Sequence, residues 1–211
     1  LFSLFVSPFT IYLSPAPMPQ ITRESLMTLE AYSKARNEFR AKVIAHKKKR
    51  TIHLGEHVTL LFEDELTMRY QVQEMLRAER IFEETDIMEE LAAYNPLVPD
   101  GTNWKVTMLI EYEDVAERTR ALEQLKGIED RVWVQVAGHT RVFAIADEDA
   151  ERENQQKTAA AHFLRFELTP QMISSLKADG SLAMGVAHPA YAVEVAEIDP
   201  VSARALSSDL A

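Results

Sequence analysis

The chain has 211 residues, of which 46% are hydrophobic and 27% charged, a balance typical of an ordinary globular protein. It contains no cysteine, which excludes disulfides, thiolate metal sites and cysteine nucleophiles within the chain. The formal net charge of -10 at pH 7 argues against nucleic-acid binding, because neutralising phosphate groups requires a basic protein surface.

Residues 1–17 form an uncharged, apolar and proline-punctuated stretch that does not begin with methionine. The stretch lacks the basic region of a secretory signal, and its apolar run is shorter than the about 20 residues of a membrane helix. We therefore expect a non-native or upstream-translated extension, followed by a normal start at Met18. Residues 18–211 are long enough for one buried core and predict a single domain, with a cytoplasmic location and no membrane association.

A long helical pattern follows this stretch. Thr22 is a candidate N-cap, and apolar residues then recur at helical spacing as far as the basic cluster KKKR at residues 47–50. Basic residues in a last helical turn complement the helix dipole, so the cluster is typical of a solvated helix end. An anion-binding site is the alternative interpretation of the cluster.

A β-hairpin is predicted next, with strands over residues 51–54 and 57–62 and a turn at Gly55. The hairpin contains the string HLGEH, which matches the H-x-x-E-H pattern of one class of zinc peptidase. Those enzymes place both histidines and the glutamate on one face of a helix. Since Gly55 lies between two β-patterned segments, we interpret His53 and His57 as exposed residues beside a turn.

Two more helices are expected over residues 63–82 and 87–94, and Thr85 and Asp86 offer an N-cap for the second. The helix over 63–82 has two apolar faces. One holds Met68, Val72, Met75, Leu76 and Phe82, and the other holds Leu66, Tyr70 and Ile81. Two apolar faces need two partners, and the second partner is either the sheet or another subunit of a homodimer.

The second half of the chain is richer in strands. The expected strands cover residues 104–113, 132–136, 141–146, 162–168, 182–187 and 191–196. The expected helices cover residues 114–126 and 170–177 and a short segment after Pro200, and the polar stretch 147–158 is either a surface helix or a loop. Short turns between grouped strands predict an α+β fold, with a mainly antiparallel sheet, helices packed on one face and a helix-rich N-terminal half.

Charged residues within the second apolar face of the 63–82 helix offer one candidate site. Glu74 and Arg77 lie there, and because isolated buried charges are costly we expect them to be paired or hydrogen-bonded. Structural ion pairing is one interpretation. The other is a cleft in which Tyr70, Glu74, Arg77 and Arg80 bind an anion, or in which Glu74 helps to hold a metal, since arginine suits carboxylate and phosphate groups.

A further candidate lies in the strand pattern over residues 162–168. Alternation places His162 on the apolar face and Arg165 on the opposite face. A single histidine on an apolar face is typical of a core residue with local hydrogen-bond partners, and ligand binding is the alternative. No Ser/His/Asp or paired-carboxylate arrangement can be identified by spacing.

Several segments of the chain together resemble one bacterial family. They are LLFED (60–64), YQVQEMLR (70–77), ERIF (79–82), YNPLVPDG (94–101) and HFLRFEL (162–168). Over residues 18–211 the chain is similar to the uncharacterised domain of unknown function 3501 family, which carries no known catalytic residues. Genes of that family tend to neighbour genes for rubrerythrin-like proteins and an iron–sulfur oxidoreductase. The resemblance therefore implies a rubrerythrin-like or iron–sulfur partner and an association with oxidative stress.

Two functional hypotheses follow. The first is a non-catalytic accessory or interaction protein of a cytosolic redox system, which holds no redox centre itself. The second is a small enzyme, or a protein that binds an anion or a metal, with a site built from Tyr70, Glu74, Arg77 and Arg80 and a histidine. The sequence identifies neither a substrate nor a cofactor.

Overall fold

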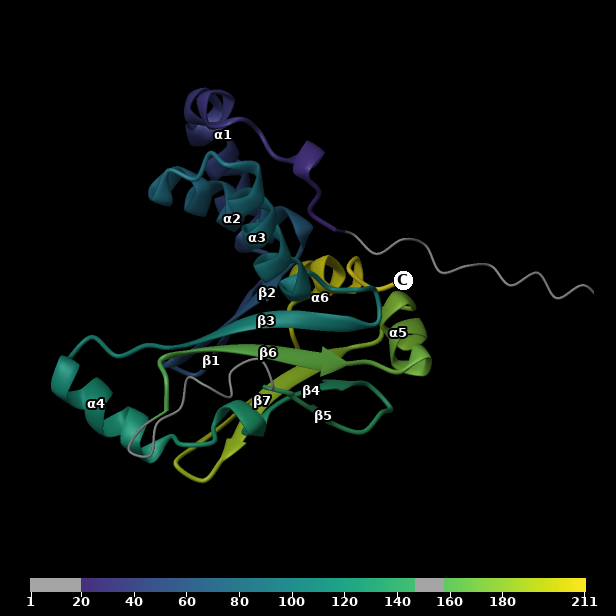
Figure 1. The fold of residues 1–211 in the computed structure, drawn as a ribbon. Coiled ribbons are helices and arrows are strands. Elements are labelled where there is room, and N and C mark those ends of the chain that lie inside the picture. The colour runs from purple at the N-terminus through teal and green to yellow at the C-terminus, as the bar shows by residue number, and fades with distance from the viewer. Residues whose placement is uncertain (1–19, 147–157) are drawn as a thin grey trace, which may run out of the picture.

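The computed structural model describes residues 20–146 and 158–211 and shows an α+β fold (Figure 1). Eight strands of the described residues form two antiparallel sheets of four strands each. The α+β class, the antiparallel pairing and the helix-rich first half predicted from the sequence are therefore confirmed. The strands are divided between two sheets, whereas the sequence pattern suggested one.

The first sheet contains the predicted hairpin. Its strands, in spatial order, are β1 (Thr51–Leu54), β2 (Val58–Glu63), β3 (Asn103–Ile110) and β6 (Ala161–Glu167). Gly55 lies in the β1–β2 turn with φ +72°, and a Cβ at this position would lie 2.6 Å from the hydroxyl of Tyr191. The positive φ and the close hydroxyl both favour glycine in this turn.

The second sheet lies against the first. Its strands, in spatial order, are β5 (Val142–Phe143), β4 (Val132–Val136), β7 (Leu182–His188) and β8 (Tyr191–Val195). The sheets meet at both edges: Ile145 forms an antiparallel bridge with Arg165 of β6, and the Tyr191 hydroxyl donates to the carbonyl oxygen of Leu54 at 2.6 Å. The two sheets thereby enclose one main core.

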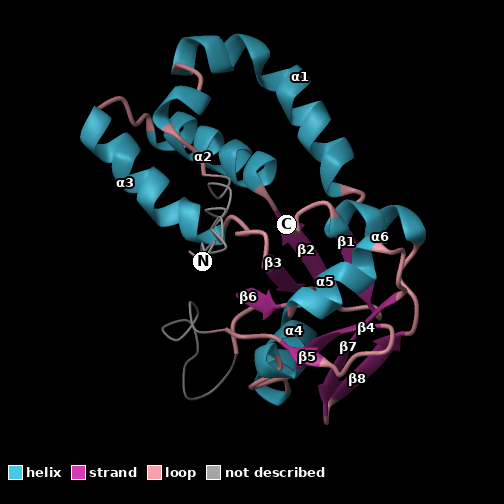
Figure 2. Cartoon of the chain, turned by 90° about the vertical axis from the view of Figure 1, so that its right-hand side faces the viewer, coloured by secondary structure: helices cyan, strands magenta, loops and turns pink. Residues whose placement is uncertain are grey.

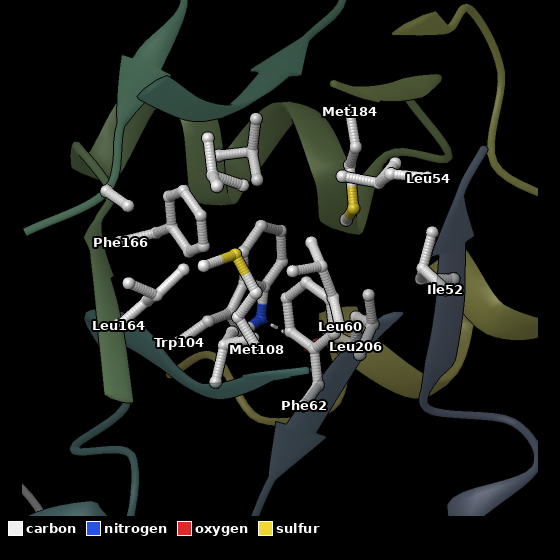
Figure 3. Packing of buried hydrophobic residues seen from close by; sticks show 14 of the residues in the cluster. Ile52, Leu54, Leu60, Phe62, Trp104, Met108, Leu164, Phe166, Met184 and Leu206 are labelled. Carbon is white, nitrogen blue, oxygen red and sulfur yellow. Dashed lines mark hydrogen bonds between the residues drawn. The ribbon is translucent and has the colours of Figure 1, made fainter. Parts of the chain in front are cut away.

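The centre of the main core is Trp104 of β3, which is fully buried (Figure 3). The ring of Phe62 meets Trp104 edge-on, with 5.6 Å between the ring centroids. Trp104 Nε1 donates to the carbonyl oxygen of Leu206 at 3.0 Å, so the one polar atom of the indole is satisfied inside the core. This bond ties the last helix of the chain to the middle of the first sheet.

Three further helices complete the sheet region. They are α4 (Val115–Gln124), α5 (Pro170–Lys177) and α6 (Pro200–Ser207). Each begins after a residue whose side chain accepts a hydrogen bond from the first turn, namely Asp114, Thr169 and Asp199. The predicted limits of the 170–177 helix are confirmed. The helix begins at Pro170 because proline is well suited to a first helical turn.

The remaining helices, α1 (Leu29–Lys47), α2 (Glu65–Glu79) and α3 (Glu84–Tyr94), form a helical arm that stands off from the sheets (Figures 1 and 2). The arm has a small core of its own, made of Ile21, Leu26, Met68, Val72, Leu76, Ile87, Leu91 and Val98. Asn95 fastens the segment before α1 to this core, because its side-chain amide exchanges two hydrogen bonds with the backbone of Ile21.

Two helix starts differ from the sequence prediction. The first long helix begins at Leu29, after Thr28, whose hydroxyl accepts from the backbone N–H of Ala31. Thr22 precedes only the short 3-10 turn Arg23–Ser25. Helix α3 begins at Glu84, ahead of the predicted cap residues Thr85 and Asp86. Several Thr and Asp residues near these helix starts could serve as the cap, so the cap pattern alone does not fix the first helical residue.

Residues 1–17 and nearly all of the polar stretch 147–158 lie outside the described residues. Within 20–146 and 158–211, no helix combines the length and the apolar character that crossing a membrane requires.

Candidate functional site

Glu74, the central residue of the predicted site, belongs to α2, and both oxygens of its carboxylate accept hydrogen bonds from α1. Arg36 of α1 donates two hydrogen bonds to its carboxylate, from Nε to Oε1 at 2.8 Å and from Nη2 to Oε2 at 2.6 Å. The buried hydroxyl of Tyr32 donates a third to Oε1 at 2.6 Å. Such a two-pronged arginine–carboxylate pair is among the stronger charged contacts in proteins. Glu74 is paired, as its position predicted, but its partner is Arg36.

The electrostatics of this cluster favour the ionised carboxylate. The hydrogen bonds from Arg36, followed by that from Tyr32, lower the pKa of Glu74 from its ordinary 4.5 to about 2. Burial, together with the hydrogen bond to Glu74, raises the pKa of Tyr32. At neutral pH the negatively charged carboxylate of Glu74 therefore lies against the positively charged guanidinium of Arg36.

The second apolar face of α2 contacts α1 through Tyr70. The ring of Tyr70 lies 5.9 Å from the ring of Phe39, and Phe39 in turn meets Tyr32 edge-on at 6.1 Å between centroids. The two partners that the two apolar faces of α2 require are thus α1 and α3. Tyr70 of the face that suggested a homodimer therefore packs within the chain, and a homodimer stays a prediction.

The other two residues of the predicted site, Arg77 and Arg80, are exposed. Arg80 ends α2 in the left-handed conformation, with φ 57°. The positive charge of Arg77 contributes only a minor part of the lowered pKa of Glu74. Tyr70 and Glu74 therefore lie between two helices, while Arg77 and Arg80 lie on the surface at the far end of α2.

His162 and Arg165 belong to the sheets rather than to the arm. His162 is 1% exposed, and its Nε2 lies 3.1 Å from the Thr158 hydroxyl and 2.9 Å from the carbonyl oxygen of Ala159. Arg165 pairs with Glu167 on its own strand at 2.7 Å. The apolar-face position of His162 is confirmed, and the structure does not bring either residue together with the Glu74 cluster.

The HLGEH string forms the predicted hairpin turn. His53 lies in β1, Gly55 in the turn, and His57 just before β2, so the three potential ligands do not share a helix face. Among the described residues there is no group of three or more His, Asp or Glu side chains placed to hold a metal ion.

A buried charge cluster that sequence reasoning missed lies at the base of the arm. Arg50 is 2% exposed, so the prediction of a solvated 47–50 cluster holds for Lys48 and Lys49 but is wrong for Arg50. Its guanidinium donates to Asp209 and to the carbonyl oxygens of Phe62 and Glu63. A run of basic residues carries no signal that one of them turns inward, because its partner Asp209 lies 159 residues away.

Asp64 and His46 extend this cluster. The carboxylate of Asp64 lies 3.6 Å from Arg50 Nη1 and 2.5 Å from His46 Nε2. Burial opposes ionisation of Asp64, but the charge of Arg50 and the backbone N–H of Thr67 together lower its pKa. Burial raises the pKa of Asp209, and the nearby charge of Asp64 adds to this effect. The cluster joins α1, β2, the start of α2 and the segment after α6.

The tip of the arm, defined here as residues 77–90, carries exposed apolar side chains. Phe82 is 69% exposed in the α2–α3 connection, and Met88 is 49% exposed one turn into α3. Six carboxylates and two arginines accompany them in this segment. In Figure 2 the α2–α3 connection lies at the end of the arm farthest from the sheets. The arm tip thus presents exposed apolar side chains within an acidic segment of the chain.

Taken together, these features define an α+β protein with a two-sheet core and a helical arm. The family model of Protein of unknown function (DUF3501) matches residues 20–210, and the chain belongs to this family. The resemblance found in the sequence is therefore confirmed.

A solved structure supports the same assignment. The crystal structure of a novel protein of unknown function from Burkholderia pseudomallei K96243 is 53% identical in sequence, with a TM-score of 0.87. The match covers 92% of this chain and 100% of that chain. No curated protein matches the chain significantly.

Proposed function

We propose that this protein is a non-catalytic interaction protein that docks onto a partner through the tip of its helical arm. The observation that carries the proposal is the exposure of Phe82 and Met88 on a helical unit that already has its own core. Large apolar side chains that fold stability does not require are typical of protein–protein contacts when they gather within one segment.

The chemistry of the tip suggests what the partner surface contains. The segment of residues 79–90 carries six carboxylates along with the two apolar side chains, and one of them, Glu84, is paired with Arg23. A complementary partner therefore offers an apolar pocket with lysine or arginine side chains at its rim, because charge complementarity guides encounter and fixes orientation.

The partner class that we propose is a rubrerythrin-like or iron–sulfur protein of the cytosol, in a pathway of peroxide or oxygen stress. Its support is the gene neighbourhood that the family resemblance implies. The chain contains no cysteine, so thiolate-ligated redox centres would belong to the partner.

The rival proposal is a small enzyme or a protein that binds an anion or metal with Tyr70, Glu74, Arg77 and Arg80. The geometry favours it less, because both carboxylate oxygens of Glu74 are bound by α1 and the aromatic ring of Tyr70 packs on Phe39. An anion would have to rely on the exposed Arg77 and Arg80, and exposed ion pairs contribute little.

The proposal is tested by measuring association of the whole chain with a purified rubrerythrin-like protein and with a purified iron–sulfur protein. The unmodified chain is expected to bind one of them in biolayer interferometry. The double variant Phe82→Ser and Met88→Ser is expected to bind at least about tenfold more weakly, because truncating a central apolar contact typically costs this much or more.

A matched control distinguishes the tip from apolar surface in general. Val115 and Phe143 are 63% and 44% exposed and belong to α4 and β5, away from the arm. The variant Val115→Ser and Phe143→Ser should bind like the unmodified chain. Equal binding by both double variants, or the absence of binding to either candidate partner, would refute docking through the tip.

A further inference from the structure

A surface groove lies at the open end of the first sheet, beside the β1–β2 turn. Its volume is about 850 Å³, and the residues that matter for its chemistry are His53, His57, Thr59, Glu111, Tyr112 and Glu117. They come from β1, the hairpin turn, β2, the segment after β3 and the start of α4. We call it the hairpin groove, and it is separate from the arm tip.

His57 is held in one orientation by contacts on several sides. Its ring stacks on Tyr112 with 3.8 Å between centroids and 15° between ring planes. Its Nδ1 lies 3.0 Å from the carbonyl oxygen of Glu111, and its backbone N–H donates to the Tyr191 hydroxyl at 3.1 Å. Because a carbonyl oxygen only accepts, Nδ1 carries the proton, and Nε2 of the neutral ring is left as a hydrogen-bond acceptor.

His53 is fixed in the same protonation pattern by a chain of two hydrogen bonds. The Thr59 hydroxyl donates to Glu111 Oε2 at 2.6 Å, since a carboxylate can only accept. The same hydroxyl must then accept from His53 Nδ1, which lies 3.1 Å away. Nε2 of neutral His53 is therefore an acceptor as well. In both histidines that line the groove, Nδ1 is hydrogen-bonded within the protein. Nε2 of the neutral ring can accept a further hydrogen bond.

The charges around the groove also favour a positively charged hydrogen-bond donor. Among the residues that the structure describes, four glutamates line it, namely Glu56, Glu111, Glu113 and Glu117, together with one cation, Arg118. All four glutamates are exposed. With accepting nitrogens and carboxylates in one groove, the complementary group is a cation with several N–H donors, which a guanidinium or ammonium group supplies.

We propose that the hairpin groove binds a basic segment of another protein, with arginine or lysine side chains lying among its glutamates and histidines. The volume is at the upper end of the roughly 300–1,000 Å³ range of single small-molecule sites, so the groove accommodates more than one side chain. The exposure of its carboxylates fits an extended segment laid across the surface better than an enclosed small molecule.

The test uses the full chain and a fluorescent hexapeptide of alternating arginine and glycine, followed by fluorescence anisotropy. The expected result is saturable binding that weakens as salt is raised towards about 0.15 M, where exposed charges are strongly screened. The same peptide with glutamine in place of arginine should not bind. The double variant Glu113→Gln and Glu117→Gln should bind about five- to tenfold more weakly, because exposed charge pairs are individually modest.

A matched control separates the groove from the general negative charge of the protein. Glu38 and Glu89 are exposed on α1 and α3, so Glu38→Gln with Glu89→Gln removes the same charge elsewhere. This variant should keep the unmodified affinity. An equal loss in both double variants would show non-specific attraction and overturn the proposal, as would the absence of binding by the arginine peptide.

Two further measurements decide between occupants. Spermidine binding that Glu113→Gln and Glu117→Gln abolish, with no peptide binding, would overturn the proposal in favour of a small organic cation. Self-association of the chain in sedimentation, lost in the same variant, would assign the groove to a second copy and also overturn it. Because the groove and the arm tip are separate surfaces, docking through the tip can hold or fail independently of these outcomes.

Discussion

At the scale of single residues, Glu74 shows how one carboxylate fastens two helices. Its oxygens receive hydrogen bonds from Arg36 and Tyr32 on α1 while its backbone belongs to α2. The energetic benefit of this arrangement exists only while the carboxylate is ionised, because a protonated carboxyl cannot accept the same set of charged hydrogen bonds. The contact between α1 and α2 should therefore depend on pH.

The lowered pKa of Glu74 fixes the sign and the range of this dependence. Since folding lowers the pKa from 4.5 to about 2, the stabilising contribution is present above about pH 4.5 and is lost as the pH falls towards 2. The Glu74→Gln variant should unfold at a lower urea concentration than the unmodified chain at pH 7. The difference between the two should shrink below about pH 4.5 and disappear near pH 2, as monitored by circular dichroism.

Arg77→Ala provides the comparison for this experiment. Arg77 is exposed, and surface substitutions of this kind usually change stability by less than about 0.5 kcal/mol. A pH-independent difference between Glu74→Gln and the unmodified chain would contradict the assigned role of the carboxylate. A large loss of stability in Arg77→Ala would show that the partner of Glu74 is on its own helix after all.

At the scale of elements, the Arg50 cluster determines how the end of the chain is held. Arg50 follows α1 and donates to Asp209, which follows α6, and to the carbonyl oxygens of Phe62 and Glu63 at the end of β2. Asp64, its second carboxylate neighbour, caps α2 by accepting from Thr67. The base of the arm, the first sheet and the C-terminal segment are thus joined through a single guanidinium.

Removing that guanidinium should be costly because it leaves two carboxylates near each other in a mostly buried place. We expect Arg50→Met to lower the free energy of unfolding by about 3–5 kcal/mol, the typical effect of breaking a buried ion pair from one side. The double variant Arg50→Met and Asp209→Leu should recover part of this loss, since it also removes an unpaired carboxylate. Urea unfolding measures both values.

Arg204→Met is the matched control, because Arg204 is exposed on α6. Its free energy of unfolding should stay within about 0.5 kcal/mol of the unmodified value. The structural role of Arg50 would be disproved if Arg50→Met cost no more than Arg204→Met. Failure of Asp209→Leu to restore any stability would indicate that Asp64 alone carries the unpaired charge.

At the scale of the whole molecule, two separate cores divide the protein into regions of unequal size. The main core draws on both sheets and on α4–α6, whereas the arm core comprises eight buried residues. Much of α1 is exposed, and only Tyr32 and Val43 of its nineteen residues are buried. Regions with fewer buried apolar contacts open at lower free energy than the rest of a protein.

Native-state hydrogen exchange should reveal this difference. The backbone amides of α1 and α3 are expected to exchange through openings of lower free energy than those of β3 and β7, which lie in the middle of the two sheets. Mass spectrometry of peptides from these four elements gives the measurement. Equal protection of α1 and β3 would show that the arm and the sheets open as one cooperative unit.

Features that depend on residues close together in the chain could be predicted from the sequence. Period-two alternation and turn glycines identified the β1–β2 hairpin, and the Pro170 start placed α5 correctly, because these signals act within a few residues. Alternation also placed His162 on the buried face of its strand. The family could be recognised because its segments are specific strings of residues.

What the sequence determined by itself was the set of local elements, the α+β class and the family, since local steric preferences and apolar periodicity are written in neighbouring residues. Only the tertiary structure decided that the strands divide into two sheets, that Arg36 rather than Arg77 holds Glu74, and that Arg50 is buried against Asp209. It also brought His53, Thr59 and Glu111 together in one groove. The physical reason is that these partners lie up to 159 residues apart, and no spacing rule connects residues that meet only after the chain has packed.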